Sequence, residues 1–157
     1  MSADRIRKLL PGDFEQISSV VDDWWGGRPM RSMIPRLFFE HFYSTSLAIG
    51  EPGQVVGFLI GFVSQSLPAS AYIHFVGVHP SARGQGFARS MYEAFFANVA
   101  ALGCKEVQCI TSPVNRGSIA FHLRMGFELL AGDAQVDGVP VFLDHAAPGE
   151  HRVRFRK

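Results

Sequence analysis

The sequence predicts an α+β fold, with a central mixed, mostly antiparallel sheet flanked by helices on both faces. Two observations lead to this prediction. Short apolar runs bounded by turn residues alternate with stretches in which apolar residues recur at helical spacing. The clearest run, Tyr72 to Val78, is rich in aromatic and branched residues and stops before Pro80, which cannot donate to a sheet ladder. No repeat or long linker interrupts the chain, so residues 1–157 are expected to form a single domain.

The first half of the chain is predicted to place two helices and a hairpin ahead of this strand. Pro11 and Gly12 end the first strand, and Asp13 has the side chain of a helix N-cap. The turn residues Glu51 to Gln54 separate the two hairpin strands. The predicted elements are a strand at 5–9, a helix that follows the Asp13 cap, carries its apolar face from Phe14 to Trp24 and ends at Gly26-Gly27, a second helix at 34–43, and strands at 46–50 and 55–64.

The second half is predicted to hold a long helix, a strand, a short helix and a less regular tail. The long helix carries an apolar face and ends at Gly103. Residues 133–149 contain turn signals at Asp137-Gly138 and Pro148-Gly149 and are expected to be less regular than the rest of the chain. The apolar residues of the helix are Phe87, Met91, Phe95, Val99 and Leu102. The remaining predicted elements are strands at 106–111, 127–130 and 153–155 and a helix at 118–125.

Composition limits the classes of partner. The net charge is +1, so nothing in the charge favours nucleic acid or an anionic membrane. The longest apolar run, Val55 to Val63, is too short to cross a bilayer and is typical of a buried strand. Met1 to Lys8 is charged and lacks the apolar segment of a secretory leader. Cys104 and Cys109 are expected about 16 Å apart in one strand, beyond disulfide reach, and free thiols fit a cytoplasmic location.

The segment after the central strand has the composition of an anion-binding loop. Gly84 and Gly86 precede the long helix, whose first N–H groups are unpaired and lie at the positive end of its dipole. Glycines also let the backbone approach a phosphate closely. No G-K-[ST] follows, which excludes a P-loop, and Arg89 stands where the dinucleotide fingerprint has its third glycine. The alternative is a tight turn that leads into a core helix.

Two motifs resemble the signatures of the GNAT superfamily, the acyl-CoA-dependent N-acyltransferases. The first, R-x-x-G-x-A from Arg83 to Ala88, is similar to the family's acetyl-CoA signature. The second, N-x-x-S-I-x-F-H-x-x-x-G-F from Asn115 to Phe127, is similar to N-x-x-[SA]-x-x-[LF]-Y-x-x-x-G-F. Both the order of the motifs and the order of the predicted elements are those of a GNAT domain. The resemblance implies the GNAT fold, in which the fourth and fifth strands splay apart.

The resemblance also implies acetyl-CoA as co-substrate. The strand backbone around Val76 and Val78 would pair with the pantetheine arm, and an N–H near Val76 would polarise the thioester carbonyl. The loop from Gly84 to Arg89 would hold the pyrophosphate, and Asn115 would contact the cofactor from the other side. The residues implied for cofactor binding are Val76, Gly77, Val78, Arg83, Gly84, Gln85, Gly86, Phe87, Ala88, Arg89, Asn115 and Ser118.

The implied catalytic residues depart from the family's pattern. His122 stands where members commonly have a tyrosine that protonates the leaving thiolate, and a histidine must be charged to donate there. Tyr72 stands where many members have a carboxylate base, and tyrosine is no base at neutral pH. His74, two residues on, is expected on the same face and is predicted to relay the amine proton. The alternative for both histidines is a packed structural role. His74 and His79 are expected on opposite faces, so no metal site is predicted.

In this family the acceptor pocket lies between the first two helices and the late strands, here residues 22–27 and 133–145. Asp22 is a candidate to hold a cationic amine, and Trp24 or Trp25 to add a cation–π contact. The alternative is a solvated helix end with core indoles.

The sequence therefore predicts an N-acetyltransferase that moves an acetyl group from acetyl-CoA to a primary amine of a small molecule or peptide, by direct attack in a ternary complex. A protein N-terminal or lysine acetyltransferase and a non-catalytic acyl-CoA-binding module are the alternatives. No nucleic-acid or membrane partner is expected. The sequence names neither the amine nor the oligomeric state, although homodimers are common in the family.

Overall fold

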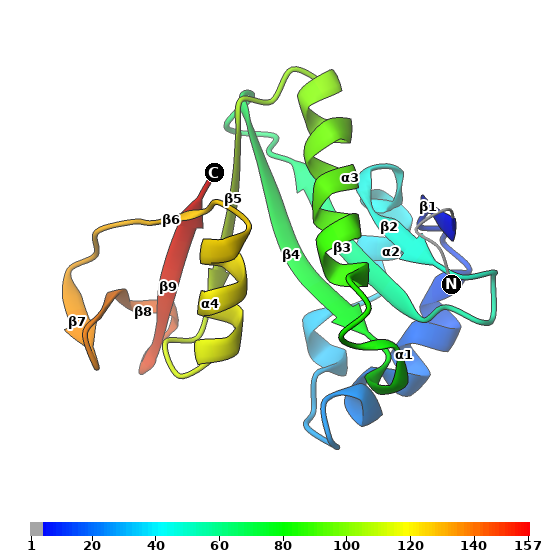
Figure 1. The fold of residues 1–157 in the computed structure, drawn as a ribbon, viewed down its shortest axis with the longest axis horizontal. Coiled ribbons are helices and arrows are strands. Elements are labelled where there is room, and N and C mark those ends of the chain that lie inside the picture. Colours follow the sequence, from blue (N-terminus) through cyan, green and yellow to red (C-terminus); the bar gives the residue numbers. More distant parts are fainter. Residues whose placement is uncertain (1–4) are drawn as a thin grey trace. The chain divides into compact units, whose positions relative to one another are not determined.

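The computed structural model describes residues 5–157, which form two compact units; the first ends at Cys104 and the second runs from Lys105 to Lys157 (Figure 1). No helix in the described range is long and apolar enough to cross a bilayer. The prediction made from Met1 to Lys8, that no leader is present, lies partly outside the described residues. That residues 1–157 form a single domain stays a prediction.

Four antiparallel strands form the sheet of the first unit. The register pairs Ala48 with both Arg7 and Phe58, and it pairs Leu59 with Val76. The hairpin predicted around Glu51 to Gln54 is confirmed, with shorter strands than expected. In spatial order the strands are β1 (Ile6–Lys8), β2 (Leu47–Ile49), β3 (Gly57–Val63) and β4 (Ser70–Val78).

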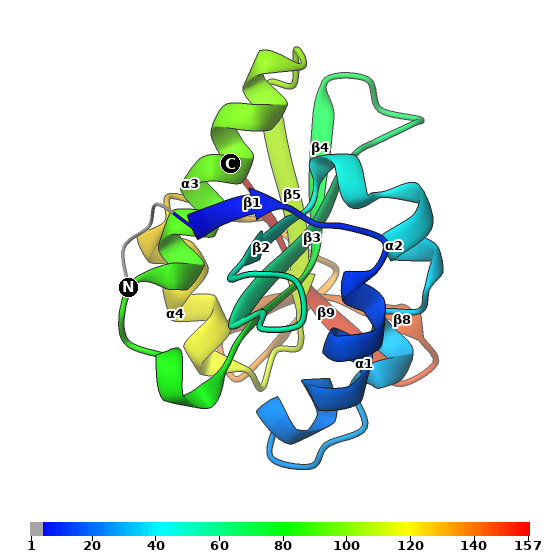
Figure 2. The ribbon, with the colours of Figure 1, turned by 90° about the vertical axis from the view of Figure 1, so that its right-hand side faces the viewer.

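Helices cover both faces of this sheet, as predicted (Figure 2). On one face lies α3 (Phe87–Ala101), which approaches closely because Gly61 has no side chain; a Cβ there would lie 2.4 Å from the ring of Phe95. On the other face lie α1 (Asp13–Trp24) and α2 (Leu37–His41). The core under α1 and α2 contains Leu9, Ile17, Val21, Trp24, Ile34, Phe39, Ala48, Val55, Phe58, Ile60 and Phe75. Short 3₁₀ turns lie at Arg31–Met33, Tyr43–Thr45 and Pro80–Ala82.

Three local expectations for the first unit are wrong. Asp13 is the first residue of α1 rather than its N-cap, and its buried carboxylate accepts hydrogen bonds from the Leu10 N–H and the Arg7 guanidinium. The second helix spans only Leu37–His41, because residues 34–36 are not helical and a 3₁₀ turn begins at Tyr43. Leu102 lies beyond α3 and is 63% exposed, so helical spacing alone extends the apolar face too far.

A β-bulge in β4 changes which histidines share a face. The pairing shifts by one residue between Ile60 and Gly61 of β3, which leaves His74 as an extra residue on β4. The ring of His74 stacks on a ring of α2, and the ring of His79 contacts a ring of α1. The expectation that His74 and His79 lie on opposite faces is therefore wrong, because the bulge breaks the two-residue alternation.

Strand β9 is the centre of the sheet in the second unit. It pairs with β5 along one edge and with β6 and β8 along the other, and β7 pairs with β8; all these pairs are antiparallel. The elements are β5 (Glu106–Thr111), α4 (Arg116–Arg124), β6 (Glu128–Leu129), β7 (Ala134–Val136), β8 (Val139–Ala147) and β9 (Glu150–Arg156). Helix α4 covers one face, where the ring of His122 stacks on Phe155. The predicted α+β fold is confirmed.

The expectation that residues 133–149 are less regular missed two strands, since β7 and β8 form a hairpin there. The predicted turn at Asp137 and Gly138 is confirmed, with φ of 49° and 80°. Such positive values suit Asp and Gly in a tight hairpin turn. Strand β8 escaped prediction because only one of its nine residues is buried and an irregularity between Phe142 and Ala147 breaks the alternation of its side chains.

Candidate active site

The peptide groups of β4 alternate in direction, and two residues predicted to bind the cofactor point away from β3. The His79 N–H donates to the Val56 oxygen at 2.8 Å, within the register that β3 and β4 share. Backbone groups two residues apart in a strand point the same way, so the N–H and C=O of Gly77 also point toward β3. The N–H and C=O of Val76 and Val78 point to the opposite edge of β4. This is the direction that pairing with an extended pantetheine arm requires.

The loop after β4 presents a run of backbone donors. Gly84 and Gly86 have φ of 76° and 82°, and Gly86 is the N-cap of α3. A Cβ on Gly86 would meet no protein atom within 4 Å, so the backbone conformation rather than space favours glycine there. Within residues 5–157, the N–H groups from Gly84 to Arg89 donate to no protein acceptor; the first helical bond runs from the Ser90 N–H to the Gly86 oxygen. Such a run at the start of a helix binds anions.

The side chains of this loop are engaged within the protein. Arg83 donates to the carbonyl oxygens of Val78 and Trp24, so it ties the loop to β4 and to the end of α1. Arg89 pairs with Glu93 one helical turn on, at 2.9 Å. The groups that this loop offers an anion are therefore mainly backbone N–H groups. Among the other loop residues predicted to bind cofactor, Gln85 is exposed, Ala88 half-buried and Phe87 buried.

The two indoles predicted to contact the acceptor have different surroundings. Trp24 is 5% exposed and packs against Phe58 with ring centroids 5.9 Å apart, which fits the alternative of a core indole. Trp25 is half-buried and lies 5.0 Å from the ring of Phe75. It also covers Gly77, where a Cβ would come within 3.1 Å of the indole. Trp25 is therefore the indole with access to a ligand on this face of β4.

Asp22 holds the loop that follows α1. Its Oδ1 accepts hydrogen bonds from the N–H groups of Met30 at 2.9 Å and Arg31 at 2.8 Å. A carboxylate oxygen that already accepts two N–H groups has less capacity left for a cationic ligand. This geometry favours the structural alternative for Asp22, and its role in amine binding stays a prediction.

Tyr72 and His74 lie at the two ends of a row of aromatic rings. The row runs from His74 through Phe38, Phe42 and Phe62 to Tyr72, with successive centroid distances of 4.3, 5.4, 5.0 and 5.5 Å. All five side chains are half-buried. Their contact with one row confirms that Tyr72 and His74 share a face of β4.

The bond of His74 to the backbone fixes its tautomer. Its Nε2 lies 2.5 Å from the Met33 oxygen. Because a carbonyl can only accept, Nε2 carries the proton and the neutral ring keeps its lone pair on Nδ1. Burial lowers the pKa of His74 from its ordinary value of 6.5, although the Met33 bond acts in the opposite direction. The ring is thus neutral at pH 7, as a proton acceptor must be.

In the second unit, Asn115 is the N-cap of α4. Its Oδ1 accepts a hydrogen bond from the Ser118 N–H at 3.1 Å. The cap occupies the carbonyl oxygen of the amide and leaves the Nδ2 group as a donor. The cofactor contact predicted for Asn115 would therefore come from Nδ2.

His122 lies among aromatic rings of the second unit. It stacks on Phe155 at 4.8 Å and meets the edge of Phe127 at 5.3 Å. Its Nδ1 donates to the Ser118 oxygen at 2.7 Å, so the lone pair of the neutral ring lies on Nε2. Burial lowers the pKa of His122 from its ordinary value of 6.5, against the effect of the Ser118 bond. The charged form needed for proton donation is therefore scarce at neutral pH.

Sequence reasoning missed two features. One is the Met33 oxygen, because a backbone acceptor in a loop has no sequence signature. The other is Arg154 of β9, whose guanidinium lies 4.8 Å from the ring centre of Phe142. The alternation of arginines at 152, 154 and 156 is a signal that could have found it.

Neither metal nor disulfide chemistry has the residues it needs in the described range. Between residues 5 and 157 no group of three or more His, Cys, Asp or Glu side chains could hold a metal ion. Cys104 and Cys109 are free, and burial raises the pKa of the Cys109 thiol, which makes it unreactive.

A family model and curated acetyltransferases match a large part of this chain. A model of the acetyltransferase (GNAT) family matches residues 4–127. An L-2,4-diaminobutyric acid acetyltransferase from Nocardia farcinica is 28% identical over 115 residues, which cover 73% of this chain and 58% of that protein. One from Halomonas elongata is 27% identical over 115 residues, covering 66% of this chain and 60% of that protein. The chain thus spans 58–60% of the length of these curated relatives.

Solved structures share the fold at lower identity. Ard1 from Thermoplasma volcanium has a TM-score of 0.74 and 18% identity, covering 97% of this chain and 95% of that one. Diaminobutyrate acetyltransferase EctA from Paenibacillus lautus, solved with L-2,4-diaminobutyric acid and coenzyme A, has a TM-score of 0.68 and 19% identity. It covers 96% of this chain and 92% of that one. At such identities the likeness establishes a common fold.

Proposed function

Because the chain belongs to the acetyltransferase (GNAT) family, we propose that it transfers the acetyl group of acetyl-CoA to a primary amine of a small molecule. The observation that carries this proposal is the run of N–H groups from Gly84 to Arg89, which has no protein acceptor within residues 5–157. This run of N–H groups lies at the start of α3, in the segment that follows β4 in the sequence. It falls within the residues that the family model matches. A diphosphate such as that of coenzyme A is the ligand such donors suit.

The reaction needs a neutral amine, a polarised carbonyl and a proton for the leaving thiolate. The amine nitrogen attacks the thioester carbon, a C–N bond forms, the C–S bond breaks, and an acetamide and the CoA thiol result. In the proposal, the Val76 N–H polarises the carbonyl and Nδ1 of His74 takes the amine proton through water. His122 returns a proton from Nε2. The direction of the Val76 N–H and the tautomer of His74 support the first two roles.

The first acceptor to test is L-2,4-diaminobutyric acid. The curated relatives from Nocardia farcinica and Halomonas elongata are acetyltransferases of this compound. A small diamino acid also agrees with the half-buried Trp25 on the α1 side of β4, whose indole can contact a cationic amine.

The test is release of CoA thiol from acetyl-CoA with a panel of amines, with the amide product identified by mass spectrometry. The panel contains L-2,4-diaminobutyric acid, 1,3-diaminopropane, and peptides with a free N-terminus or a lysine. Saturable thiol release with a small amine is expected. Activity on peptides alone would replace the proposal with a protein acetyltransferase. If the protein binds acetyl-CoA but releases no thiol with any amine, the non-catalytic acyl-CoA-binding module replaces the proposal. The scarcity of the charged form of His122 at neutral pH is the observation on the side of that alternative.

We also propose that the chain works as a single domain in the cytoplasm, without nucleic acid or membrane as partner. The free thiols of Cys104 and Cys109 and the net charge of +1 support this location and this choice of partners. Sedimentation at several protein concentrations would distinguish a monomer from a homodimer.

A further inference from the structure

The glycine at position 77 of β4 leaves a space that aromatic rings of the first unit fill. A Cβ on Gly77 would lie 2.6 Å from the ring of Phe58 and 3.1 Å from Cη2 of Trp25, and contacts as short as 2.6 Å do not occur for real Cβ atoms. Trp25 also packs on Phe75, with ring centroids 5.0 Å apart. Three rings therefore close the α1 side of β4 at Gly77.

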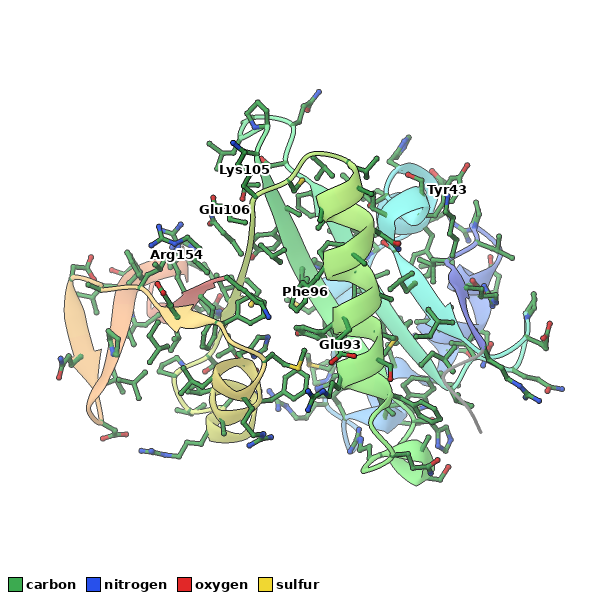
Figure 3. The ribbon with its side chains drawn as sticks, turned by 45° about the horizontal axis from the view of Figure 1, so that its top comes forward. Tyr43, Glu93, Phe96, Lys105, Glu106 and Arg154 are labelled. Carbon is green, nitrogen blue, oxygen red and sulfur yellow. The ribbon has the colours of Figure 1, made fainter. Side chains whose placement is uncertain are left out.

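Trp25 is the outermost of these three rings. Phe58 is fully buried and Phe75 nearly so, whereas Trp25 is half-buried. The other face of this sheet is covered by α3, the helix that carries Glu93 and Phe96 in Figure 3. A group that approaches β4 from the α1 side therefore meets the indole of Trp25 before it meets the two phenylalanines.

Hydrogen bonds fix the backbone around Trp25. Its N–H donates to the Asp22 oxygen at 3.1 Å, and its oxygen accepts from the Arg28 N–H at 3.3 Å. Arg83, in the loop between β4 and α3, donates to the oxygen of the preceding residue, Trp24. Because a shift of the indole would disturb these bonds, the ring forms a stiff wall against a ligand that presses on it.

The free edge of β4 lies beside this wall. In the proposed function the thioester carbonyl binds the Val76 N–H, which points away from β3. Gly77 is the next residue, and neighbouring Cα atoms are about 3.8 Å apart. The acyl group therefore begins one residue from the position that the indole covers. A methyl group needs little space there, whereas a longer chain directed to the α1 side is blocked by the indole.

We propose that Trp25 sets the length of the acyl group, so that the site accepts acetyl-CoA and excludes thioesters of CoA with longer acyl chains. The inference rests on the proposed function and adds the residue that selects the donor. An added methylene is rejected because it must either displace a packed ring or turn back into water.

The test measures the binding of a series of thioesters by calorimetry. No acceptor amine is present, so a contact between Trp25 and the amine does not contribute. The series contains CoA, acetyl-CoA, propionyl-CoA and butyryl-CoA. In the wild type, each methylene beyond acetyl is expected to weaken binding about 10-fold, the lower end of the discrimination that an apolar pocket gives. In Trp25→Ala, butyryl-CoA should bind at least as tightly as acetyl-CoA, and the affinity for CoA should stay that of the wild type.

Two further variants separate the wall from the packing of α1. Trp25→Phe keeps a ring against Phe75 and removes the atoms around Cη2, so it should admit propionyl-CoA and still reject butyryl-CoA. This variant keeps the test decisive if the alanine variant does not fold. Trp24→Phe is the matched control, because it changes the neighbouring indole, which is 5% exposed, and it should retain the wild-type order of affinities.

Tryptophan fluorescence gives a second readout, since the chain has two tryptophans. In Trp24→Phe the remaining indole is Trp25, and its emission should change more with acetyl-CoA than with CoA. In Trp25→Phe the remaining indole is the buried Trp24, and the two ligands should have the same effect on it.

The outcomes distinguish this inference from the proposed function. Wild-type binding that ignores acyl length, or an order of affinities that both Trp25 variants leave unchanged, would overturn the inference, and thiol release with an amine would still uphold acetyl transfer. Selection of acyl length that depends on Trp25, without thiol release on any amine, would overturn the proposed function and retain the acyl site.

Discussion

The Nε2 atom of His74 donates a hydrogen bond to the main-chain oxygen of Met33 over 2.5 Å. The bulge that adds His74 to β4 brings its ring to the α2 side, where Phe38 stacks on it. These two contacts fix the ring plane and leave Nδ1 as the basic atom. A ring held in this way, and kept neutral by burial, has the properties of a general base.

His74→Phe is expected to lower kcat by about 10²-fold or more, because it removes the basic atom and retains a ring to stack on Phe38. Since burial lowers the pKa of His74 below 6.5, the wild-type kcat/KM should lose its dependence on this group above that pH and fall as the pH decreases below it. The variant should lack this acidic limb in a pH series of initial rates. Tyr72→Phe, at the other end of the same aromatic row, is the control and should keep it. An acidic limb that survives in His74→Phe would assign the base to another group.

Gly86→Glu should abolish acetyl-CoA binding, because a carboxylate would then stand beside the N–H groups that are proposed to bind the diphosphate. Gly86→Ala tests the backbone alone. Its Cβ meets no protein atom, so the expected cost is the strain of φ +82°, about 1 kcal/mol of unfolding free energy. Gly103→Ala is the matched control, since Gly103 has φ +93° and equally open surroundings at the other end of α3.

Calorimetry with acetyl-CoA and thermal unfolding separate the two effects. Both alanine variants should lose similar stability, whereas only the variants at Gly86 should lose affinity. Unchanged acetyl-CoA affinity in Gly86→Glu would remove the central observation of the proposed function.

Local patterns in the sequence were sufficient for most of the elements. Strand β5 was predicted at the residues where it occurs, and α3 was predicted from the spacing that buries Phe87, Met91 and Phe95. These features depend on short-range periodicity, which the sequence displays directly. The bulge at His74 depends on pairing with β3, so a strictly alternating strand was the natural prediction, and it placed His74 and His79 on opposite faces.

The site was predictable to the extent that backbone geometry follows from glycine positions. Gly84 and Gly86 have the positive φ that the predicted loop requires, and the N–H groups from Gly84 to Arg89 donate to no acceptor within residues 5–157; that this loop binds a phosphate stays a prediction. The partners of the charged side chains were not predictable in this way. Arg83 donates to the Trp24 oxygen 59 residues away, and Asp22 accepts from the loop at Met30. Such pairs are decided by tertiary packing, and no local pattern distinguishes them from ligand-binding residues.

The capping role of Asn115 uses Oδ1 and its predicted cofactor contact uses Nδ2, so two substitutions can test the two roles separately. Asn115→Asp keeps an oxygen for the Ser118 N–H, and hence the cap of α4, but removes the Nδ2 donor. We expect it to keep the melting temperature and raise the KM for acetyl-CoA. Asn115→Ala should instead lose about 1 kcal/mol of stability, because the cap is absent. An Asp variant with wild-type KM for acetyl-CoA would limit Asn115 to capping.

His122 is where the sequence departs from the family's tyrosine. If its Nε2 protonates the leaving thiolate, the supply of the acid form falls as the pH rises above its pKa, which burial places below 6.5. The supply of neutral amine rises over the same range. The kcat profile should therefore be bell-shaped, with a descending limb at lower pH than a tyrosine donor would give. His122→Tyr should stay active and move this limb to higher pH.

The same pKa links His122 to stability. A folded-state pKa below the unfolded value of 6.5 means that the unfolded chain binds the proton more readily. Stability should therefore be greatest above pH 6.5 with respect to this group and decrease as the pH falls from 6.5 toward the folded-state pKa. His122→Phe removes the titrating imidazole. The melting temperature of this variant should therefore depend less on pH in this range.

Comparison of alanine with phenylalanine decides between the two roles of His122. His122→Ala is expected to lower kcat by about 10²-fold or more if the residue is the acid. It should also lose about 2–4 kcal/mol of stability, because Phe155 and Phe127 lose their packing partner. His122→Phe keeps a ring between those side chains and offers no proton, so it should recover the stability and not the rate. Recovery of both stability and kcat at every pH would make His122 a packing residue, and the thiolate would then take its proton from solvent or from another group such as Tyr72.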